Sequence, residues 1–443
     1  MKAEWAGKTA ADLGRAIEAG EADPVELTQA FLDEINAHPL RNRIYARLTE
    51  ERALSEAAAA SERARSGHRL SPLDGVPISW KDLYDTAGVA TEAGSALLAG
   101  RVPDSDAQVL SNATKQGLIC LGKTHMSELA FSGLGYNPIT ETPPSVNDPD
   151  AVAGGSSSGA AASVAFGLAA AGIGSDTGGS VRIPSVWNDL VGLKTTHGRL
   201  SLEGVVPLCE RFDTVGPLCR SVEDAALVMA AMTGEKSADL SGASLADTRL
   251  LIPENVAMDD LAPEVAAGFT SAVERLQNVG AKVERREIPA IEKAMKLTAV
   301  LFAAEAYGTW QAEIEAAPHK MFPEILERFR GGARFAAWEF VRAWQDLTSY
   351  RVEWLQSVSG YDAVILPTCP ILPPKIERLK TDHDYYVSNN LAALRNTRIG
   401  NLMGLTALTI PTGVPSTGLM MMTPPSTDER LLRLGAAAEA ALS

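Results

Sequence analysis

The chain has 443 residues, of which 46% are hydrophobic and 21% are charged, so it has enough apolar material for a sizeable core, which excludes wholesale disorder. Asp and Glu outnumber Lys and Arg by 55 to 40, which gives a formal net charge of -15. A surface of that sign repels phosphate backbones and anionic lipid, so we expect no direct nucleic-acid binding and no membrane association.

The N-terminal residues 1–6 include an acidic residue and lead into an amphipathic pattern, unlike the apolar core of a secretory signal. No window of the chain approaches 18 uncharged apolar residues, which is the length that a membrane-spanning helix needs. These features predict a cytoplasmic enzyme.

Residues 1–65 are predicted to form an N-terminal helical layer. Asp23 and Pro24 are typical of a helix start, with a capping side chain followed by proline in the first turn. Apolar and small residues then recur at helical spacing through residues 28–35. Residues 50–66 are rich in alanine, glutamate and arginine and predict a second helix.

A strand is predicted from residue 76 onward, because Val76, Ile78 and Trp80 alternate with other residues at a period of two. Lys81 then follows on the opposite face from these large apolar side chains. Further short apolar runs predict strands at 118–121, 250–252, 363–366 and 407–410, with helical stretches between them. This alternation predicts the α/β fold class with a buried, largely parallel or mixed sheet.

The glycine-rich stretch 154–204 differs from its surroundings, and its middle, 160–171, is apolar on every side. We predict a buried central helix there, flanked by loops that approach other backbone or a ligand closely. Residues 235–350 contain amphipathic helical patterns and no flexible linker. They predict a helical insertion or cap on one domain that spans 1–443.

Several common nucleotide-binding and metal-binding sites are excluded because the chain lacks residues that they require. Residues 154–160 have the glycine spacing of a phosphate loop, but Ala160 stands where lysine is needed. The six histidines lack the spacing of a zinc hydrolase, and the four cysteines contain no C-x-x-C pair. We therefore expect no metal and no organic cofactor.

Residues 155–159 match the G-x-S-x-G nucleophile elbow of α/β-hydrolases, with Ser157 as the nucleophile. That elbow requires a strand before it, whereas residues 147–153 carry two acids and a proline and make a poor strand. The elbow is therefore the less favoured alternative.

A second candidate nucleophile is Ser180, which follows Gly178 and Gly179. Two glycines leave the backbone N–H groups free to converge on a developing oxyanion, although a turn with a capping serine has the same composition. A serine needs a base, and a desolvated lysine can serve. Lys81 is the candidate base, and the alternative is a solvated residue at a strand end.

Three segments in the same order resemble the amidase signature family: 75–82 (GVPISWKD), 154–159 (GGSSSG), and 174–184 (GSDTGGSVRIP) continuing to 191–195 (VGLKT). The separation of 24 residues between Ser156 and Ser180 also agrees with the family. Weaker similarity occurs at 123–130, 366–368, 395–397 and 428–432, so the resemblance covers nearly the whole chain. It implies a single large domain with a central mixed sheet covered by helices on both faces.

The resemblance also implies the roles of the site residues. Ser180 would be the nucleophile, Ser156 a bridging serine after a cis peptide bond, and Lys81 the neutral base. The oxyanion hole would be formed by the backbone N–H groups of Thr177, Gly178, Gly179 and Ser180. An acyl-enzyme would form on Ser180, and water would then complete hydrolysis without a cofactor.

Three functions are compatible with this resemblance. The favoured hypothesis is an amidase that cleaves the C–N bond of small amides and whose substrates extend to carbamates or esters, acting as a monomer or homodimer. The alternatives are the glutaminase subunit of a tRNA-dependent amidotransferase and a non-catalytic scaffold. The intact Lys81, Ser156 and Ser180 argue against the scaffold. The family resemblance suggests an apolar substrate pocket lined by Met126, Phe131, Leu134 and Tyr136, although each of these residues is equally compatible with core packing.

Overall fold

An 11-stranded mixed sheet crosses the molecule in the order β1-β3-β2-β4-β6-β5-β10-β11-β9-β7-β8. The structure is a computed structural model and describes residues 5 and 7–443; most of the N-terminal stretch considered above, residues 1–4 and 6, lies outside the described residues. The strands are β1 (Tyr45–Leu48), β2 (Pro77–Lys81), β3 (Ile119–Thr124), β4 (Ala171–Ser175), β5 (Val191–Lys194), β6 (Val215–Cys219), β7 (Arg249–Pro253), β8 (Lys282–Arg286), β9 (Ala363–Pro367), β10 (Thr406–Pro411) and β11 (Gly418–Thr423).

Both parallel and antiparallel pairs occur in this sheet. β2 lies between β3 and β4 and runs parallel to both, and β7 runs parallel to β8 and β9. The remaining neighbours pair antiparallel. The mixed sheet and all five predicted strands are confirmed, because β2, β3, β7, β9 and β10 fall on the predicted segments.

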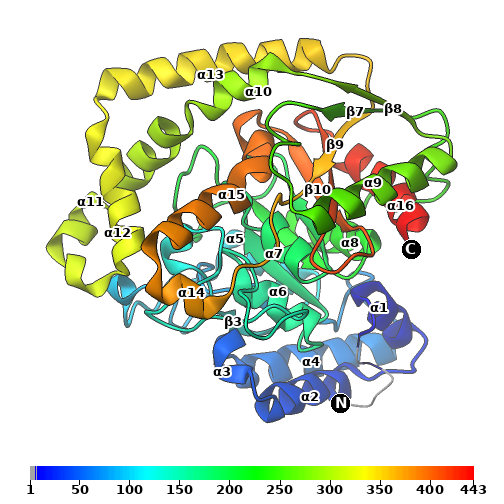
Figure 1. Ribbon diagram of the computed structural model, residues 1–443. Helices are drawn as coiled ribbons and strands as arrows, with labels where there is room; N and C mark the ends of the chain where they lie inside the picture. Colours follow the sequence, from blue (N-terminus) through cyan, green and yellow to red (C-terminus); the bar gives the residue numbers. More distant parts are fainter. Residues whose placement is uncertain (1–4, 6) are drawn as a thin grey trace.

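Helices cover both faces of the sheet (Figure 1). They are α1 (Ala10–Glu18), α2 (Pro24–Ala37), α3 (Arg41–Ile44), α4 (Glu50–Ser66), α5 (Gln108–Lys115), α6 (Ser158–Ala165), α7 (Arg182–Trp187), α8 (Val222–Thr233), α9 (Pro263–Asn278), α10 (Pro289–Met295), α11 (Ala304–Ala316), α12 (Pro323–Arg330), α13 (Ala337–Ser357), α14 (Ile376–Thr381), α15 (His383–Leu402) and α16 (Asp428–Leu442). Within residues 5 and 7–443, no helix is long and apolar enough to cross a membrane.

The alternation of side chains along β11 divides the core in two. Met420 and Met422 pack into the larger hydrophobic cluster, whereas Leu419 and Met421 pack into a second cluster with α8, α9 and α16. Successive residues of a strand point to opposite faces, so both faces of this strand are buried. One domain therefore contains a core on each side of its sheet.

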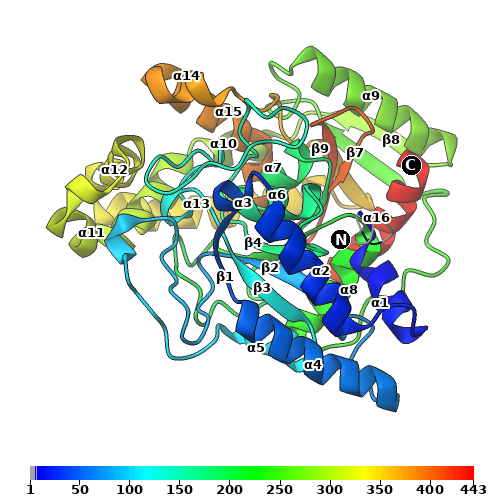
Figure 2. The ribbon, with the colours of Figure 1, turned by 90° about the horizontal axis from the view of Figure 1, so that it is seen from below.

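The N-terminal helices α1–α4 lie together at one end of the molecule (Figures 1 and 2). The predicted start of α2 is confirmed, because Oδ1 of Asp23 accepts a hydrogen bond from the backbone N–H of Val25 at 2.8 Å. This carboxylate satisfies an amide that has no partner inside the helix. α2 and α4 pack on each other and cover β3.

The helix predicted over 160–171 is shorter than expected, because α6 ends at Ala165 and β4 begins at Ala171. Gly167 lies between them with φ +76°, in the left-handed region that glycine favours. The composition of 160–171 is apolar throughout because a buried helix and a buried strand follow each other there. Periodicity cannot separate two such elements.

The 235–350 segment contains strands as well as the expected helices. β7 and β8 join the edge of the main sheet, with α9 between them. α10–α13 follow and form a helical arm along the top and left of the molecule (Figure 1). Most of β8 is exposed and carries Lys282, Arg285 and Arg286, which is how natural edge strands avoid pairing with another chain.

Candidate active site

Lys81 is the last residue of β2, which lies between β3 and β4, and its side chain is fully buried. Its Nζ is within hydrogen-bond distance of two hydroxyl oxygens, 2.7 Å from Oγ of Ser156 and 2.8 Å from Oγ of Ser175. Ser175 ends the neighbouring parallel strand β4, and parallel strands end at the same edge of a sheet. The parallel pairing therefore brings this lysine to Ser175, and the loop that carries Ser156 covers the same point.

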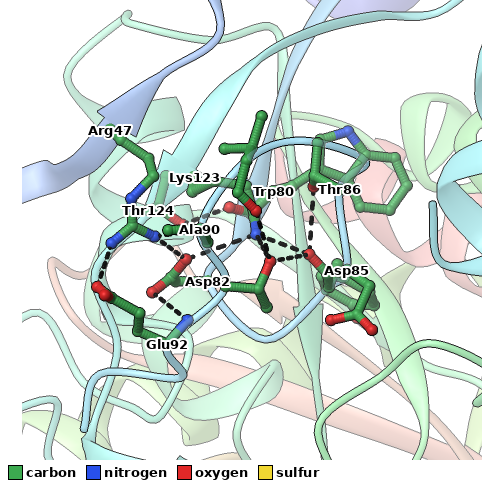
Figure 3. Close-up of polar contacts among 12 residues, drawn as sticks. Arg47, Trp80, Asp82, Asp85, Thr86, Ala90, Glu92, Lys123 and Thr124 are labelled. Carbon is green, nitrogen blue, oxygen red and sulfur yellow. Dashed lines mark hydrogen bonds and ion pairs between the residues drawn. The ribbon is translucent and has the colours of Figure 1, made fainter. Parts of the chain in front are cut away.

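Asp82, the residue after Lys81, is held by a network of charges on the side of β3 (Figure 3). Its Oδ1 lies 2.5 Å from the guanidinium of Arg47 and 3.5 Å from Nζ of Lys123, which is itself fully buried. The guanidinium of Arg47 also pairs with Glu92. The network fixes the end of β2, and with it the position of the Lys81 side chain.

We expect Asp82→Asn to destabilise the fold by about 3 to 5 kcal/mol, because it leaves the buried ammonium of Lys123 without a countercharge. The free energy of unfolding in urea measures this loss. Glu92→Gln is the matched control, since Glu92 is partly exposed and its loss should cost about 1 kcal/mol or less. Equal losses in the two variants would contradict the role given to Asp82.

The loop 154–157 passes very close to other backbone. A Cβ atom on Gly155 would lie 2.4 Å from the backbone nitrogen of Gly135, so only glycine fits there. The peptide bond between Gly155 and Ser156 is cis, as the family resemblance predicts. The carbonyl oxygen of Ser156 accepts from the N–H of Ser127 at 3.1 Å, and the Ser156 side chain then faces Lys81.

Ser157, the alternative nucleophile, has a different environment. Its side chain is fully buried, and its Oγ exchanges hydrogen bonds of 3.3 Å with the carbonyl oxygen and N–H of Ser175. The segment directly before it, residues 147–153, is not a strand and forms only isolated bridges. Both observations disagree with an elbow, which follows a strand and exposes its serine.

Ser180 lies in the loop that joins β4 to α7, and this loop is organised by Asp176. Oδ1 of Asp176 accepts from the N–H of Gly179 at 2.8 Å, and its other oxygen accepts from the N–H of Val181 at 3.2 Å. Arg182 pairs with the same carboxylate at 2.9 Å, and both side chains are fully buried. Asp176 thus ties the residues on either side of Ser180 into one rigid turn.

The segments that carry Ser156 and Ser180 lie against each other, because the N–H of Ser157 donates to the carbonyl oxygen of Ser180 at 3.3 Å. Four backbone N–H groups were predicted to form the oxyanion hole. That of Gly179 is committed to Asp176, whereas those of Thr177, Gly178 and Ser180 have no hydrogen-bond partner within residues 5 and 7–443.

The electrostatics of the site favour a neutral lysine. Burial lowers the pKa of Lys81 to about 7, although the negative charges of Asp176 and Asp213 act in the opposite direction. Burial raises the pKa of Asp176, but the Arg182 guanidinium, helped by Lys194 and Asn401, outweighs it and holds that pKa at about 2. The site thus combines a carboxylate that stays ionised and shapes the loop with an amine that loses its proton near pH 7.

A cavity opens beside Ser180, and its lining includes Thr177, Gly178, Phe131 and Phe302. The part of the cavity at the serine has a volume of only about 20 Å³. It adjoins a larger part of about 430 Å³, and Phe131 and Phe302 line both parts. Within the described residues, no group of three His, Cys, Asp or Glu side chains is arranged to hold a metal ion.

The four residues suggested for the substrate pocket are not all at this cavity. Phe131 lines both of its parts. Met126 and Leu134 are fully buried in the core, and Tyr136 lines a separate cavity of about 470 Å³ that Arg43 also lines. The structure therefore brings one of the four beside Ser180.

Several residues at the site escaped the sequence analysis. Ser175 is a second hydroxyl partner of Lys81, and Asp213 accepts a hydrogen bond from the Thr177 side chain. Arg328 and Arg398 line the cavity from α12 and α15. Ser175 and Asp176 lie inside the glycine-rich motif, so the motif itself was a signal for them. Asp213, Arg328 and Arg398 come from segments whose sequence carries no motif that marks them as site residues.

Comparison with known proteins shows the family to which the chain belongs. The sequence model of a family described as Amidase matches residues 26–432. The chain is 35% identical over 446 residues to the 2-amino-5-chloromuconic acid deaminase of Comamonas testosteroni, covering 97% of this chain and 96% of that protein. It is 33% identical over 459 residues to a glutamyl-tRNA(Gln) amidotransferase subunit of Chloroflexus aggregans, covering 95% and 93% of the two chains.

A similar fold occurs among solved structures. A crystal structure described as an amidase superposes with a TM-score of 0.88 at 30% identity, covering 98% of this chain and 100% of that one. The similarity therefore extends over the whole sheet and its helices rather than over one motif.

Proposed function

Because the chain belongs to the amidase signature family of carbon–nitrogen hydrolases, we propose that it cleaves small amides through an acyl-enzyme on Ser180. The observation that carries the proposal is the buried contact of 2.7 Å between Nζ of Lys81 and Oγ of Ser156. A lysine with a pKa of about 7 is unprotonated in about half of the molecules at pH 7, and in this form it can accept the proton of a serine.

In the proposed reaction, Oγ of Ser180 attacks the amide carbonyl while its proton passes through Ser156 to Lys81. The free N–H groups of Thr177, Gly178 and Ser180 stabilise the oxyanion. The C–N bond then breaks, and the proton returns from Lys81 through Ser156 to the leaving amine. Water, deprotonated along the same route, attacks the ester on Ser180 and releases the carboxylic acid. Phe131 is the proposed apolar contact for the substrate.

The test is the release of ammonia or amine by the purified chain from aryl amides, alkyl amides, carbamates, esters and glutamine. Mass spectrometry of the quenched reaction should find an acyl group on the peptide that contains Ser180. Turnover with an acyl group on another residue, or without any acyl-enzyme when hydroxylamine is added as a trap, would refute the proposal.

A second candidate is the glutaminase component of a tRNA-dependent amidotransferase, which the 33% identity to the Chloroflexus aggregans protein favours. The glutamine arm of the same panel distinguishes the two. Hydrolysis of glutamine alone, stimulated by further components of such a complex, would favour the second candidate, whereas hydrolysis of other amides by the chain alone favours the first.

We propose that the protein acts in the cytoplasm on a small molecule, as a monomer or homodimer, without nucleic acid or membrane. Its net charge of -15 supports the part of this proposal that concerns nucleic acid and membrane, because an acidic surface repels both phosphate backbones and anionic lipid. Light scattering of the purified chain determines the oligomeric state.

Activity is expected to rise with pH through about 7, because Lys81 accepts a proton only in its neutral form. Below this pKa, kcat/KM should fall about tenfold for each pH unit, and above about pH 8 it should level off. The pH profile should be measured with an uncharged amide as the substrate, because only groups of the protein then titrate. A profile that is flat from about pH 5 to about pH 9 would contradict a lysine base.

A further inference from the structure

The outward side of α13 is apolar although it faces solvent. This helix runs along the top of the molecule (Figure 1), and its inner side packs on α10 and on residues 299–303. Leu347 and Trp354 on the inner side are buried, whereas a surface helix normally carries polar residues on the opposite side. Within residues 5 and 7–443, nine large hydrophobic side chains are exposed, and four of them lie on the outward side of α13: Trp338, Val341, Val352 and Leu355.

These four side chains and two uncharged neighbours, Gln345 and Thr348, form one exposed row, which we call the α13 row. Successive members of the row are alternately three and four residues apart, which is the spacing of the contact line between two packed helices. Trp338 is 71% exposed and Val341 is 55% exposed. Single exposed hydrophobic residues are common, whereas a row of them along one helix marks an interaction surface.

The α13 row is symmetric about its midpoint, which lies between residues 346 and 347. Trp338 and Leu355 are equally far from this midpoint, and the two valines are as well. A twofold axis through the midpoint packs a second α13 antiparallel on the first, so that Trp338 of one copy meets Leu355 of the other. Val341 then meets Val352. A twofold dimer needs a surface that is complementary to itself, and the α13 row meets this requirement.

The charges beside the α13 row suit the same arrangement. Arg342 and Glu353 flank the row on one edge, because residues eleven apart project from a helix in nearly the same direction. Packing about the midpoint places Arg342 of each copy opposite Glu353 of the other. Both side chains are at least two-fifths exposed, and within the chain they pair with Asp346 and Lys293. Since the whole chain has a net charge of -15, two copies repel each other least along a row that carries no charge.

We propose that the protein forms a homodimer in which the α13 helices of two copies pack antiparallel along the α13 row. The helix has 21 residues and is about 30 Å long, so the contact extends over several turns. A second copy fits this surface better than an unrelated partner, because the row is complementary to itself in its apolar residues and in its flanking charges. The inference uses no residue of the active site and does not rest on the proposed function.

Sedimentation velocity of the full chain tests the association. Wild type should be a dimer at about 10 μM and above, and Val341→Asp should weaken association about 100-fold or more, because it places two carboxylates in an apolar contact. Val102→Asp is the matched control, since Val102 is 56% exposed but lies on the loop before α5 and should leave the dimer unchanged. A wild-type chain that stays monomeric at about 100 μM, or a Val341→Asp chain that dimerises like wild type, would overturn the inference.

Charge reversal tests the same contact with substitutions that keep α13 polar at its edge. Arg342→Glu should weaken the dimer about tenfold, because the new carboxylate faces Glu353 of the other copy. Adding Glu353→Arg should restore the dimer, since the opposite charges then face each other again. A double variant that associates no better than Arg342→Glu would contradict the antiparallel register.

Cross-linking determines the orientation of the two helices. The four native cysteines are buried, so introduced cysteines on α13 should react selectively. A short bis-maleimide should link Val341→Cys chains to Val352→Cys chains in a mixture. Either variant alone should be linked much less, because its two cysteines lie about 16 Å apart along the helix axis. Equal cross-linking in the mixture and in the separate variants would overturn the antiparallel pairing.

Two further results separate this inference from its alternatives. A monomeric wild-type chain that binds phosphatidylcholine vesicles, with binding lost in Val341→Asp, would assign the α13 row to a lipid surface and overturn the dimer. Hydrolysis of amides by a monomeric Val341→Asp chain supports the proposed function independently of the dimer. A wild-type dimer that hydrolyses no amide would retain this inference and refute the proposed function.

Discussion

Replacement of Ser180 by alanine is expected to lower kcat by about 10⁴- to 10⁶-fold while leaving the free energy of unfolding nearly unchanged. The side chain is the proposed nucleophile, so its removal deletes the atom that forms the acyl-enzyme. The fold should tolerate the change, because the turn around Ser180 is held by Asp176 through the backbone of Gly179 and Val181. Single-turnover measurement of amine release, with urea unfolding beside it, determines both quantities.

Ser157→Ala is the control for this prediction. Its hydroxyl bonds to the backbone of Ser175 and lies away from the cavity lining, so we expect a loss of stability of about 1 kcal/mol and less than about a tenfold change in kcat. The opposite result, with activity lost in Ser157→Ala and kept in Ser180→Ala, would restore the nucleophile elbow and refute the assignment of Ser180.

Lys81→Met is expected to lower kcat by about 10²- to 10⁴-fold, the range that a positioned general base contributes. Methionine has a similar length and removes the amine without placing a charge in the core. The residual activity should also lose the inflection near pH 7, because the group that titrates there is gone. The pH dependence of kcat/KM in the variant and in wild type measures both effects.

Lys194→Met is a matched control for Lys81→Met. Lys194 is equally buried and its pKa is also lowered by burial, to about 8, yet its Nζ donates to the carbonyl oxygens of Thr195 and Leu405. We expect its loss to reduce stability while kcat changes by less than about tenfold. Similar losses of kcat in the two variants would attribute the effect of Lys81 to packing rather than to proton transfer.

The sheet was predictable where one apolar run stands between glycine or proline boundaries. β2, β3, β7, β9 and β10 satisfy this condition, and in β2 the period of two also separated Lys81 from the large apolar side chains. β4 was missed because the apolar run of α6 leads directly into it, so composition alone shows no boundary. β7 was predicted because Leu250–Ile252 is apolar. β8 was not predicted, because it is an exposed, charged edge strand without any strand periodicity.

The site could be predicted as far as it is local in sequence. Ser156 and Ser180 each lie in a short motif of glycines and small residues, and Lys81 ends an apolar strand motif; the structure brings Lys81 to Ser156 as the resemblance predicts. The commitment of the Gly179 N–H to Asp176 could not be predicted, because it depends on how the carboxylate is turned within the loop. Arg398 was not found for another reason: nothing in a helical sequence indicates which of its arginines lines a cavity.

The long connections between the central strands also bear on how the chain folds. Lys81 on β2 contacts Ser156 and Ser175, which follow it by 75 and 94 residues, and Thr397 on α15 donates to the carbonyl oxygen of Gly178, 219 residues before it. Pairings of such high contact order form only after the cost of closing long loops has been met, so they belong to the later part of the folding reaction. Catalytic competence should therefore return last during refolding, and it reports on completion of the whole sheet rather than on any fragment.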